Sequence, residues 1–364
     1  MSHVLVSPLN WGLGHATRDI PVIQNLLARG HEVTIAACGN ARTVLEYEFP
    51  GCRSIEFPDY PVSFSGSRFF LPKFVASLPV FLKAIADEQD NLGLILADDD
   101  YDLIISDNRF GVYSSEIPSV FITHQLHYHL PLVFWPAELL AVAFNGFHHG
   151  KYRHVIVPDN PMPEISLSGK LSRPGTDTTR KRAYFCGILT STRKRTGKQD
   201  LDYLLMISGP EPQRSHLEKI LLDQVAGIEG SRVVLLGSPN NHTRVEQSDT
   251  CRIIPFASTS DKEDLMNRAK CIICRSGYTS MMEMAELGKH HAVFIPTPGQ
   301  TEQEYLSWYY EKKGWFHSQS QYNLNLAEDI RIAHQTCYTG FPDMPKTEEN
   351  VTNLYDQVFA QYLD

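Results

Sequence analysis

The sequence lacks the marks of nucleic-acid-binding and disulfide-stabilised proteins. Its formal net charge is −9, whereas a general nucleic-acid binder carries a basic face. It contains seven cysteines in 364 residues, an odd number that argues against a disulfide framework and favours a reducing compartment. Cys271 and Cys274 form a lone CxxC on an expected strand, where positions three apart face opposite sides of a sheet. Because no basic signal-like segment precedes the first expected strand, we predict a cytoplasmic protein.

Uninterrupted apolar runs of membrane-spanning length are also missing. Residues 67–85 and 130–147 are rich in leucine and phenylalanine, but prolines and charged side chains interrupt both. Residues 67–85 allow two interpretations. One is a peripheral membrane patch or acceptor groove, with Arg68, Lys73 and Lys83 facing lipid head groups. The other, which we favour, is a pair of helices packed into the core.

Motifs that hold a metal ion are scarce as well. Asp98, Asp99 and Asp100 form an acidic run before an expected strand, and we assign them to the solvated surface rather than to a metal-binding DxD motif. Histidines are more numerous, but their spacing supplies neither carboxylate partners nor a helix that presents the rings together; these are His124, His127, His129, His148 and His149. We therefore expect chemistry that requires no metal ion and no cofactor.

What the sequence does contain is a regular alternation of strands and helices. A strand at residues 4–6, a glycine-containing loop, a helix ending near Arg29 and a strand at residues 33–37 form a βαβ unit, which implies a parallel sheet. The alternation resumes in the second half of the chain, and 364 residues are ample for two cores. We predict two α/β domains, at residues 1–165 and 183–345, joined by a linker at residues 166–182 that is rich in Ser, Thr, Gly and basic residues.

The most informative stretch is residues 271–308. A buried strand ends at Cys274, a tight turn follows at residues 275–277, and a helix runs from Thr279 to Leu287, with Gly288 placed as its left-handed C-terminal residue. A strand, a glycine turn and a helix N-terminus together make an anion site, because unpaired N–H groups and the helix dipole point at the turn.

Polar side chains around this turn suggest a nucleotide sugar as the ligand. Glu283 lies in the second turn of the helix, where its carboxylate is placed to hold ribose hydroxyls. Gln303 and Glu304 open the next helix beyond the strand at residues 292–295. A phosphate cradle, a carboxylate and a polar pair outline a site for a nucleotide sugar.

This stretch resembles a known family. The sequence Arg-Ser-Gly, a Glu eight positions after the Arg, and FIPTPGQTEQEY resemble the donor-site signature of MurG-type glycosyltransferases of family 28. The resemblance implies the GT-B fold, with two Rossmann-like domains and a C-terminal helix, here residues 346–364, that packs toward the first domain. It also implies an inverting, metal-independent transfer of a hexose or N-acetylhexosamine from a UDP-sugar to a hydroxyl acceptor, soluble or lipid-linked.

The resemblance also assigns donor contacts by position. Glu283 would hold the ribose diol, while Gln303 and Glu304 would contact the sugar hydroxyls. Glu304 replaces the family's Gln, so the identity of the sugar stays open. Phe256 and the backbone of Ala257 would frame the uracil.

The leaving diphosphate requires hydrogen-bond donors and positive potential. For these we select backbone N–H groups at the 275–277 turn, a hydroxyl in the first turn of the helix, and the loop after an earlier strand. Arg275 either pairs with a phosphate or staples the loop. The other residues of this set are Ser276, Gly277, Tyr278, Thr279 and Gly209.

The expected catalytic base lies in the first domain. Gly14 and His15 follow the first strand and match a Gly-His pair of the family, and an imidazole titrates near neutral pH. Asp107 ends a later strand and, as in more distant GT-B transferases, would orient the His15 ring. The alternative is that Asp107 caps a turn with Asn108. Weaker candidates for contact with the acceptor are Arg18, Arg109 and His124.

Two other functions fit the same signals. One is a non-hydrolysing UDP-N-acetylglucosamine 2-epimerase, which shares the fold but needs several acidic residues around the sugar, of which only Glu304 and Asp107 can be placed. The other is a non-catalytic subunit that binds a sugar nucleotide for a membrane glycosyltransferase.

Overall fold

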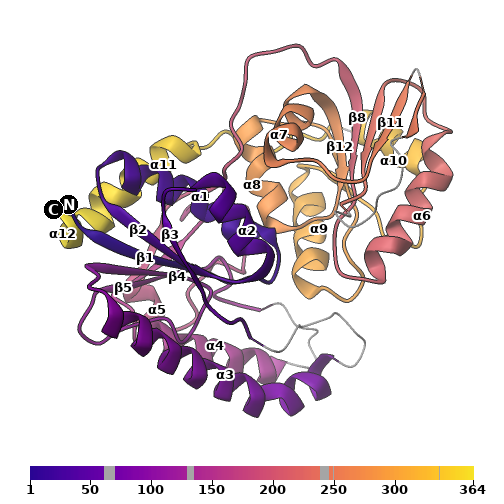
Figure 1. Cartoon of the computed structure of the whole chain (residues 1–364). Helices are drawn as coiled ribbons and strands as arrows, with labels where there is room; N and C mark the ends of the chain where they lie inside the picture. Colours follow the sequence, from indigo (N-terminus) through magenta and orange to yellow (C-terminus); the bar gives the residue numbers. More distant parts are fainter. Residues whose placement is uncertain (61–69, 129–134, 238–245, 249, 336) are drawn as a thin grey trace. The chain divides into compact units, whose positions relative to one another are not determined.

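The computed structural model describes residues 1–60, 70–128, 135–237, 246–248, 250–335 and 337–364. The chain folds as two units (Figure 1). Residues Met1–Ser191 and Met344–Asp364 form the first unit, and Thr192–Asp343 form the second. Each unit is an α/β layered structure on one sheet, which confirms the predicted fold class.

The first unit is built on a seven-stranded parallel sheet with the order β3-β2-β1-β4-β5-β6-β7. The order reverses between β1 and β4, so their carboxyl ends flank the position where open α/β sheets bind ligands. The strands are β1 (His3–Pro8), β2 (Glu32–Ala37), β3 (Arg53–Glu56), β4 (Leu103–Asp107), β5 (Ser119–Ile122), β6 (His154–Val157) and β7 (Ala183–Phe185).

Helices cover both faces of this sheet. Alternate residues of β1 face opposite layers, because Val4 and Val6 pack with α1 whereas Leu5 packs with the end of α3. The helices of the unit are α1 (Leu13–Ala28), α2 (Gly39–Glu48), α3 (Phe70–Asp98), α4 (Trp135–His149), α5 (Asp177–Arg182), α11 (Thr347–Leu354), the π-helix η2 (Tyr355–Phe359) and α12 (Ala360–Leu363).

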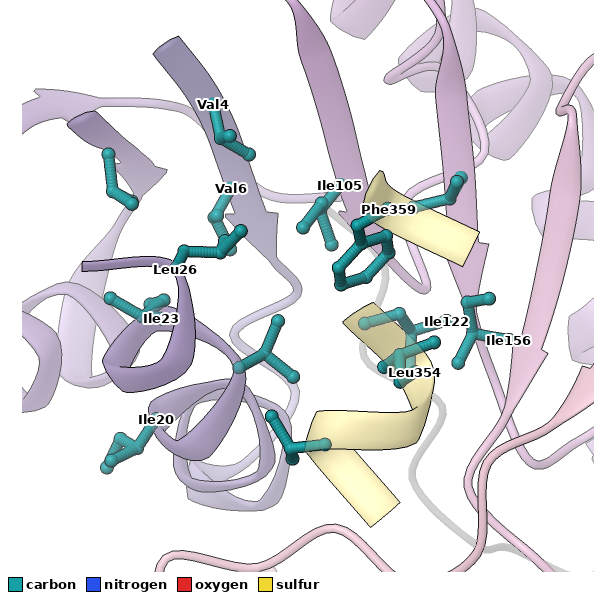
Figure 2. Close-up of a cluster of buried hydrophobic side chains, with 14 of the residues drawn as sticks. Val4, Val6, Ile20, Ile23, Leu26, Ile105, Ile122, Ile156, Leu354 and Phe359 are labelled. Carbon is teal, nitrogen blue, oxygen red and sulfur yellow. The ribbon is translucent and has the colours of Figure 1, made fainter. Parts of the chain in front are cut away.

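The C-terminal helices belong to the core of the first unit. Figure 2 shows Leu354 and Phe359 beside Ile105 and Ile122 of the sheet, with Ile23 of α1 in the same cluster. Each of these side chains is at most 1% exposed. Full burial of an aliphatic or aromatic side chain contributes about 1.5–3 kcal/mol, so the end of the chain is held mainly by apolar contacts.

Residues 166–182 are not the predicted linker. The buried carboxylate of Asp159, just after β6, accepts hydrogen bonds from the hydroxyls of Ser166 (2.7 Å), Ser168 (2.5 Å) and Ser172 (2.8 Å). The segment then forms α5 and enters β7, which pairs with β6. Its serine-rich composition therefore reflects hydrogen bonds to one buried carboxylate, and the boundary between the units lies later, after Ser191.

The second unit has a seven-stranded sheet with the order β10-β11-β9-β8-β12-β13-β14. Only β10, at one edge, runs antiparallel to its neighbour among the described strands, and the order reverses between β8 and β12. The strands are β8 (Leu201–Met206), β9 (Arg232–Leu235), β10 (Glu246–Gln247), β11 (Cys251–Ile254), β12 (Ala269–Cys274), β13 (Ala292–Phe294) and β14 (His317–Ser318). The helices are α6 (Gln213–Val225), α7 (Thr259–Arg268), α8 (Tyr278–Leu287), α9 (Thr301–Lys313) and α10 (Leu326–Gln335).

The two apolar stretches lie only partly within the described residues, because positions 61–69 and 129–134 fall outside them. At the end of the first stretch, Phe81 and Ile85 are buried, whereas Val80 and Leu82 are about half exposed. None of the helices in the described part of the chain is long and apolar enough to cross a membrane.

A buried histidine makes the stability of the second unit depend on pH. His317 of β14 lies with Nε2 2.9 Å from Oδ1 of Asp329 and Nδ1 3.4 Å from Oε1 of Glu311. Burial alone would lower the pKa of His317, but the hydrogen bonds and charges of the two carboxylates outweigh burial and raise it above 6.5.

A group with a raised folded-state pKa stabilises fully below its unfolded pKa, and this contribution disappears as pH rises through the folded value. We therefore expect the Tm of the second unit to fall as the pH rises from about 6 upward, by roughly 2–4 °C per kcal/mol lost. Thermal unfolding followed at a series of pH values should show a smaller slope in His317→Gln than in the wild type. Equal slopes would exclude His317 as the source.

Candidate functional site

The predicted site residues follow the strands at which each sheet reverses its order. In the first unit, α1 with His15 follows β1, and Asp107 is the last residue of β4, paired in register with Pro8. In the second unit, Gly209 follows β8 and the turn at residues 275–277 follows β12. Both sets therefore lie at carboxyl ends of parallel strands, where α/β sheets bind ligands.

His15 and Asp107 are in direct contact. Nδ1 of His15 lies 2.7 Å from Oδ1 of Asp107; the histidine side chain is 16% exposed and the aspartate side chain 0%. An ionised carboxylate only accepts hydrogen bonds, so the neutral ring donates its Nδ1–H and leaves Nε2 free of that proton. Of the two roles considered for Asp107, the geometry favours orientation of the histidine over a turn cap.

Arg18 holds Asp107 from the same helix. Its Nε donates to Oδ2 of Asp107 at 2.5 Å and its Nη2 donates to Oδ1, while Nη1 lies 3.4 Å from Nδ1 of His124. Arg18 is 2% exposed, and its guanidinium holds the carboxylate of Asp107 in place through these hydrogen bonds. Burial acts to raise the pKa of Asp107, but Arg18 and His15 together lower it well below its usual range.

The surroundings of His15 favour its neutral form. Burial lowers its pKa most, Asp107 raises it, and the charges of Arg18 and His124 lower it again, so that it lies below 6.5. The ring therefore combines a free Nε2 with a carboxylate that stabilises the imidazolium, which is the arrangement of a general base.

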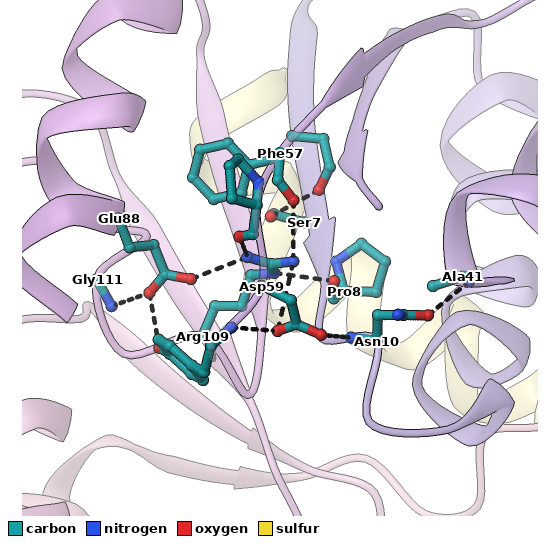
Figure 3. A network of polar contacts seen from close by, with 12 residues as sticks. Ser7, Pro8, Asn10, Ala41, Phe57, Asp59, Glu88, Arg109 and Gly111 are labelled. Carbon is teal, nitrogen blue, oxygen red and sulfur yellow. Dashed lines mark hydrogen bonds and ion pairs between the residues drawn. The ribbon is translucent and has the colours of Figure 1, made fainter. Parts of the chain in front are cut away.

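Arg109 has a different role from the acceptor contact considered for it. It is 0% exposed; Nε donates to the carbonyl of Pro8 at 2.9 Å and Nη1 to Oε1 of Glu88 at 3.0 Å (Figure 3). Asp59 lies 3.9 Å from Nη2 of Arg109 and accepts from the backbone N–H of Asn10 at 3.1 Å. Arg109 therefore supports the loop between β1 and α1 from inside the unit.

The turn before α8 has the geometry of an anion cradle. Gly277 is the N-cap residue of α8, and a Cβ placed on it would meet only Nε2 of Gln303, at 4.0 Å. The first backbone N–H groups of the helix, at Tyr278 and Thr279, precede the point where intrahelical hydrogen bonds begin. At the other end, Gly288 has φ 63° and ψ 44°, the left-handed conformation predicted for it. Space above Gly277 and the backbone N–H groups at the start of a helix together suit a phosphate.

The guanidinium of Arg275 cross-links the segments around this cradle and has no N–H group left to bind a phosphate. Its Nη1 and Nη2 each make two hydrogen bonds and its Nε makes one, so five acceptors occupy all five N–H groups. Burial lowers the pKa of Arg275 to about 10. The acceptors join the segments after β8, β13 and β14: the carbonyls of Ser208, Gln213, Ile295 and Pro296, and Oε1 of Gln321.

Ser276 and Gly209 complete the walls of the cradle. Ser276 is fully buried; its hydroxyl donates to the carbonyl of Gln303 at 2.9 Å and accepts from the hydroxyl of Ser307 at 2.9 Å. Gly209 has φ 116°, and a Cβ there would lie 3.8 Å from Nε of Arg275. The loop after β8 therefore runs close to the guanidinium of Arg275.

The carboxylate of Glu283 forms an ion pair with Lys262, a residue that the sequence did not indicate. Nζ of Lys262, in α7, lies 2.7 Å from Oε1 and 2.8 Å from Oε2 of Glu283, and the hydroxyl of Thr192 lies 3.5 Å from Oε1. Glu283 is only 3% exposed. A ribose diol would have to share this carboxylate with the ammonium group. Lys262 lies four residues after the N-cap Ser258, and that capping signal was the only clue in the sequence to its position.

Gln303 and Glu304 shape the loop between β13 and α9. Oε1 of Gln303 accepts from the backbone N–H of Thr297 and Oε1 of Glu304 from that of Gly299, each at 2.9 Å. Nε2 of Gln303 lies 4.0 Å from a Cβ placed on Gly277, so this amide borders the cradle. Phe256 follows β11 and is 52% exposed, which leaves ring surface for a nucleobase.

Within the residues that the structure describes, no three His, Cys, Asp or Glu side chains come together as a metal site. Independence from a metal ion stays a prediction, since a cation can also be held by the donor's phosphates.

Residues 229–349 match the model of the glycosyltransferase family 28 C-terminal domain. No curated protein sequence matches the chain. Solved structures with similar folds include the glycosyltransferase SnogD from Streptomyces nogalater (17% identity, 98% of this chain and 99% of that chain, TM-score 0.62) and MurG from Acinetobacter baumannii (14%, 100% and 99%, 0.56). A third is the spinosyn rhamnosyltransferase SpnG complexed with thymidine diphosphate (13%, 99% and 96%, 0.60).

The matched segment contains the cradle, Glu283 and the loop before α9, which are the elements that carried the resemblance in the sequence. The similarity to solved structures covers nearly the whole chain and both sheets, and at these identities it shows the fold. The chain is therefore a glycosyltransferase of the GT-B fold, and its residues 229–349 match the C-terminal domain of glycosyltransferase family 28.

Proposed function

We propose that this glycosyltransferase moves a hexose or N-acetylhexosamine from a UDP-sugar to a hydroxyl acceptor, with inversion and without a metal ion. The observation that carries the proposal is the 2.7 Å contact between Nδ1 of His15 and Asp107 at the reversal point of the first sheet. A base at this edge has one task in glycosyl transfer, which is to deprotonate the acceptor.

The chemical step needs two contributions from the protein. The acceptor oxygen forms a bond to the anomeric carbon, while the bond from that carbon to the phosphate oxygen breaks and the diphosphate leaves with the electron pair. Nε2 of His15 takes the acceptor's proton, and Asp107 stabilises the imidazolium that forms. The backbone N–H groups at the start of α8 receive the charge that develops on the diphosphate; one preorganised donor of this kind contributes roughly 3 kcal/mol.

Several features support a nucleoside diphosphate donor. The cradle before α8 suits a diphosphate, Phe256 offers an exposed ring, and one similar structure is a complex with thymidine diphosphate. The preference for uridine comes from the family position of Phe256, Ala257 and Glu283. The sugar stays open because Glu304 stands where the family has Gln.

The test is a screen of UDP-, GDP-, ADP- and dTDP-sugars with the full chain and a chelator, scored by release of the nucleoside diphosphate. We expect release from UDP-sugars, and a much lower rate with His15→Ala. Formation of a 2-epimer would instead favour the epimerase. Tight binding of a UDP-sugar without turnover for any acceptor, unchanged by His15→Ala, would favour the non-catalytic subunit.

The lowered pKa of His15 sets the expected pH dependence. Transfer requires the neutral ring, so kcat/KM should fall on the acid side as His15 becomes protonated. We expect the midpoint of this acid limb below about 6.5, the value for an unperturbed histidine. A pH profile measured with the acceptor well below its KM gives this midpoint, and a midpoint clearly above 6.5 would contradict a buried, neutral base.

A cytoplasmic location is part of the proposal. A peripheral membrane contact through residues 67–85 is the alternative to the core packing that we favour for this stretch. Support comes from α4, whose Leu139, Leu140 and Phe147 are each more than half exposed. Such a contact would suit a lipid-linked acceptor.

A further inference from the structure

A second carboxyl group lies buried next to the His15–Asp107 pair. Asp19 is 0% exposed and follows His15 by four residues on α1, so both side chains project from the same face of the helix. Neither carboxyl oxygen of Asp19 has a hydrogen-bond donor among the described residues. The proposed mechanism leaves this buried, unpartnered group without a role.

The charged and titratable groups around Asp19 come from several elements. Arg18 shares its helix and is committed to both oxygens of Asp107, which ends β4. His15 also lies on α1, and Nδ1 of His124, which follows β5, lies 3.4 Å from Nη1 of Arg18. The thiol of Cys186, which follows β7, is neutral because burial raises its pKa. The one guanidinium in this cluster therefore already neutralises Asp107.

An ionised Asp19 would place a second negative charge in a dry cluster that holds one cation. Burying an unpaired carboxylate is strongly unfavourable, and two neighbouring carboxylates resolve this by retaining one proton. A carboxylate only accepts hydrogen bonds, whereas a protonated carboxyl also donates one. Burial and the charge of Asp107 both raise the pKa of Asp19 well above its usual value, with Arg18 opposing.

We propose that Asp19 is a protonated positioning residue that donates its O–H to Asp107 and so keeps the His15 ring neutral in the resting enzyme. The proposal rests on the proposed function, because it assigns Asp19 a role through the catalytic base.

The charge balance explains the effect on His15. With Asp19 neutral, the single charges of Asp107 and Arg18 cancel, and the ring has no net attraction for a proton before the acceptor binds. With Asp19 ionised, the cluster would carry one excess negative charge, and His15 would hold a proton at rest and be unable to take one from the acceptor.

The first test does not depend on activity. Infrared difference spectra between the wild type and Asp19→Asn, recorded without substrate near neutral pH, should show the C=O stretch of a protonated carboxyl that is lost in the variant. The control is Asp87→Asn, which removes an exposed carboxyl on α3 and should leave that band in place. If Asp19→Asn removes only carboxylate bands, Asp19 is ionised and the proposal is wrong.

The second test is the pH profile of transfer. Asn is neutral and donates through its amide, so Asp19→Asn should keep kcat/KM within about threefold and leave the acid limb unmoved. The Leu side chain of Asp19→Leu is neutral but donates no hydrogen bond, so Asp107 attracts the proton of the His15 ring more strongly. The acid limb of this variant should therefore move to higher pH, and its kcat/KM at pH 7 should fall by roughly tenfold. An acid limb that moves to lower pH in Asp19→Asn would overturn the proposal.

The two proposals can fail separately. If His15→Ala retains full turnover, His15 is not the base, even where the infrared band of Asp19 is present. If His15→Ala is inactive but the band is absent, the proposed function stands and the role of Asp19 is wrong. Should Asp19→Leu fail to fold, the infrared result and the Asp19→Asn profile still decide.

Discussion

His15→Ala is expected to lower kcat by about 100- to 10,000-fold, the usual contribution of a general base, with little change in the KM for the donor. The loss falls on kcat because His15 acts on the acceptor's proton, whereas the predicted donor contacts lie in the second unit. Initial rates of nucleotide release with saturating donor measure the effect. As a control, His216→Ala removes an exposed histidine on α6 and should leave kcat within about twofold of the wild type.

Asp107→Asn tests the same pair from its other side. The substituted side chain keeps its size but loses the charge that fixes the Nδ1–H tautomer and stabilises the imidazolium. We expect a loss comparable to that of His15→Ala, and a double variant hardly worse than either single one, since the residues act as a unit. Near wild-type turnover in Asp107→Asn would refute the dyad.

Arg109→Met is expected to destabilise the first unit by about 3–5 kcal/mol, because it leaves a buried carboxylate without its cation. Glu88 is 4% exposed and keeps Oε1 against Arg109; its Oε2 accepts from the hydroxyl of Tyr60 and the N–H of Gly111, each at 2.7 Å. Chemical unfolding monitored by circular dichroism gives the loss. Arg53→Met is the matched control, since Arg53 pairs with Asp98 on the surface and its loss should leave the unfolding midpoint close to that of the wild type.

The double variant Arg109→Met with Glu88→Gln should recover part of this loss, because no uncompensated charge then remains. If Arg109→Met unfolds at the same denaturant concentration as Arg53→Met, the interior pair is not a stabilising feature, and Arg109 becomes available again as an acceptor contact.

The sequence predicted those parts of the molecule that depend on local pattern. Apolar periodicity and turn residues located β12, α8 and the left-handed Gly288, because strand burial and helix termination are decided by nearby residues. The order of elements was enough to place His15 and Asp107 at one sheet edge, because parallel strands bring their carboxyl ends together.

Partnerships across the fold could not be predicted in the same way. Arg109 looks like a site residue in the sequence, yet its hydrogen-bond and ion-pair partners come from β1, α3 and the loop after β3. No local sequence pattern predicts that these three segments come together. The serines after Asp159 have the composition of a linker, and only the buried carboxylate shows why they are ordered. Lys262 and Asp19 were missed for the same reason, since the role of each depends on a residue in another element.

The central claim is a single inverting displacement at the anomeric carbon with His15 as base. It is tested most directly by following donor consumption with proton NMR, in the presence of a chelator, and identifying the anomer that forms first. From an α-linked UDP-sugar, the account predicts UDP together with a β-configured product, formed by the wild type and not by His15→Ala. A product that retains the α configuration, a 2-epimer, or equal rates for the two proteins would contradict it.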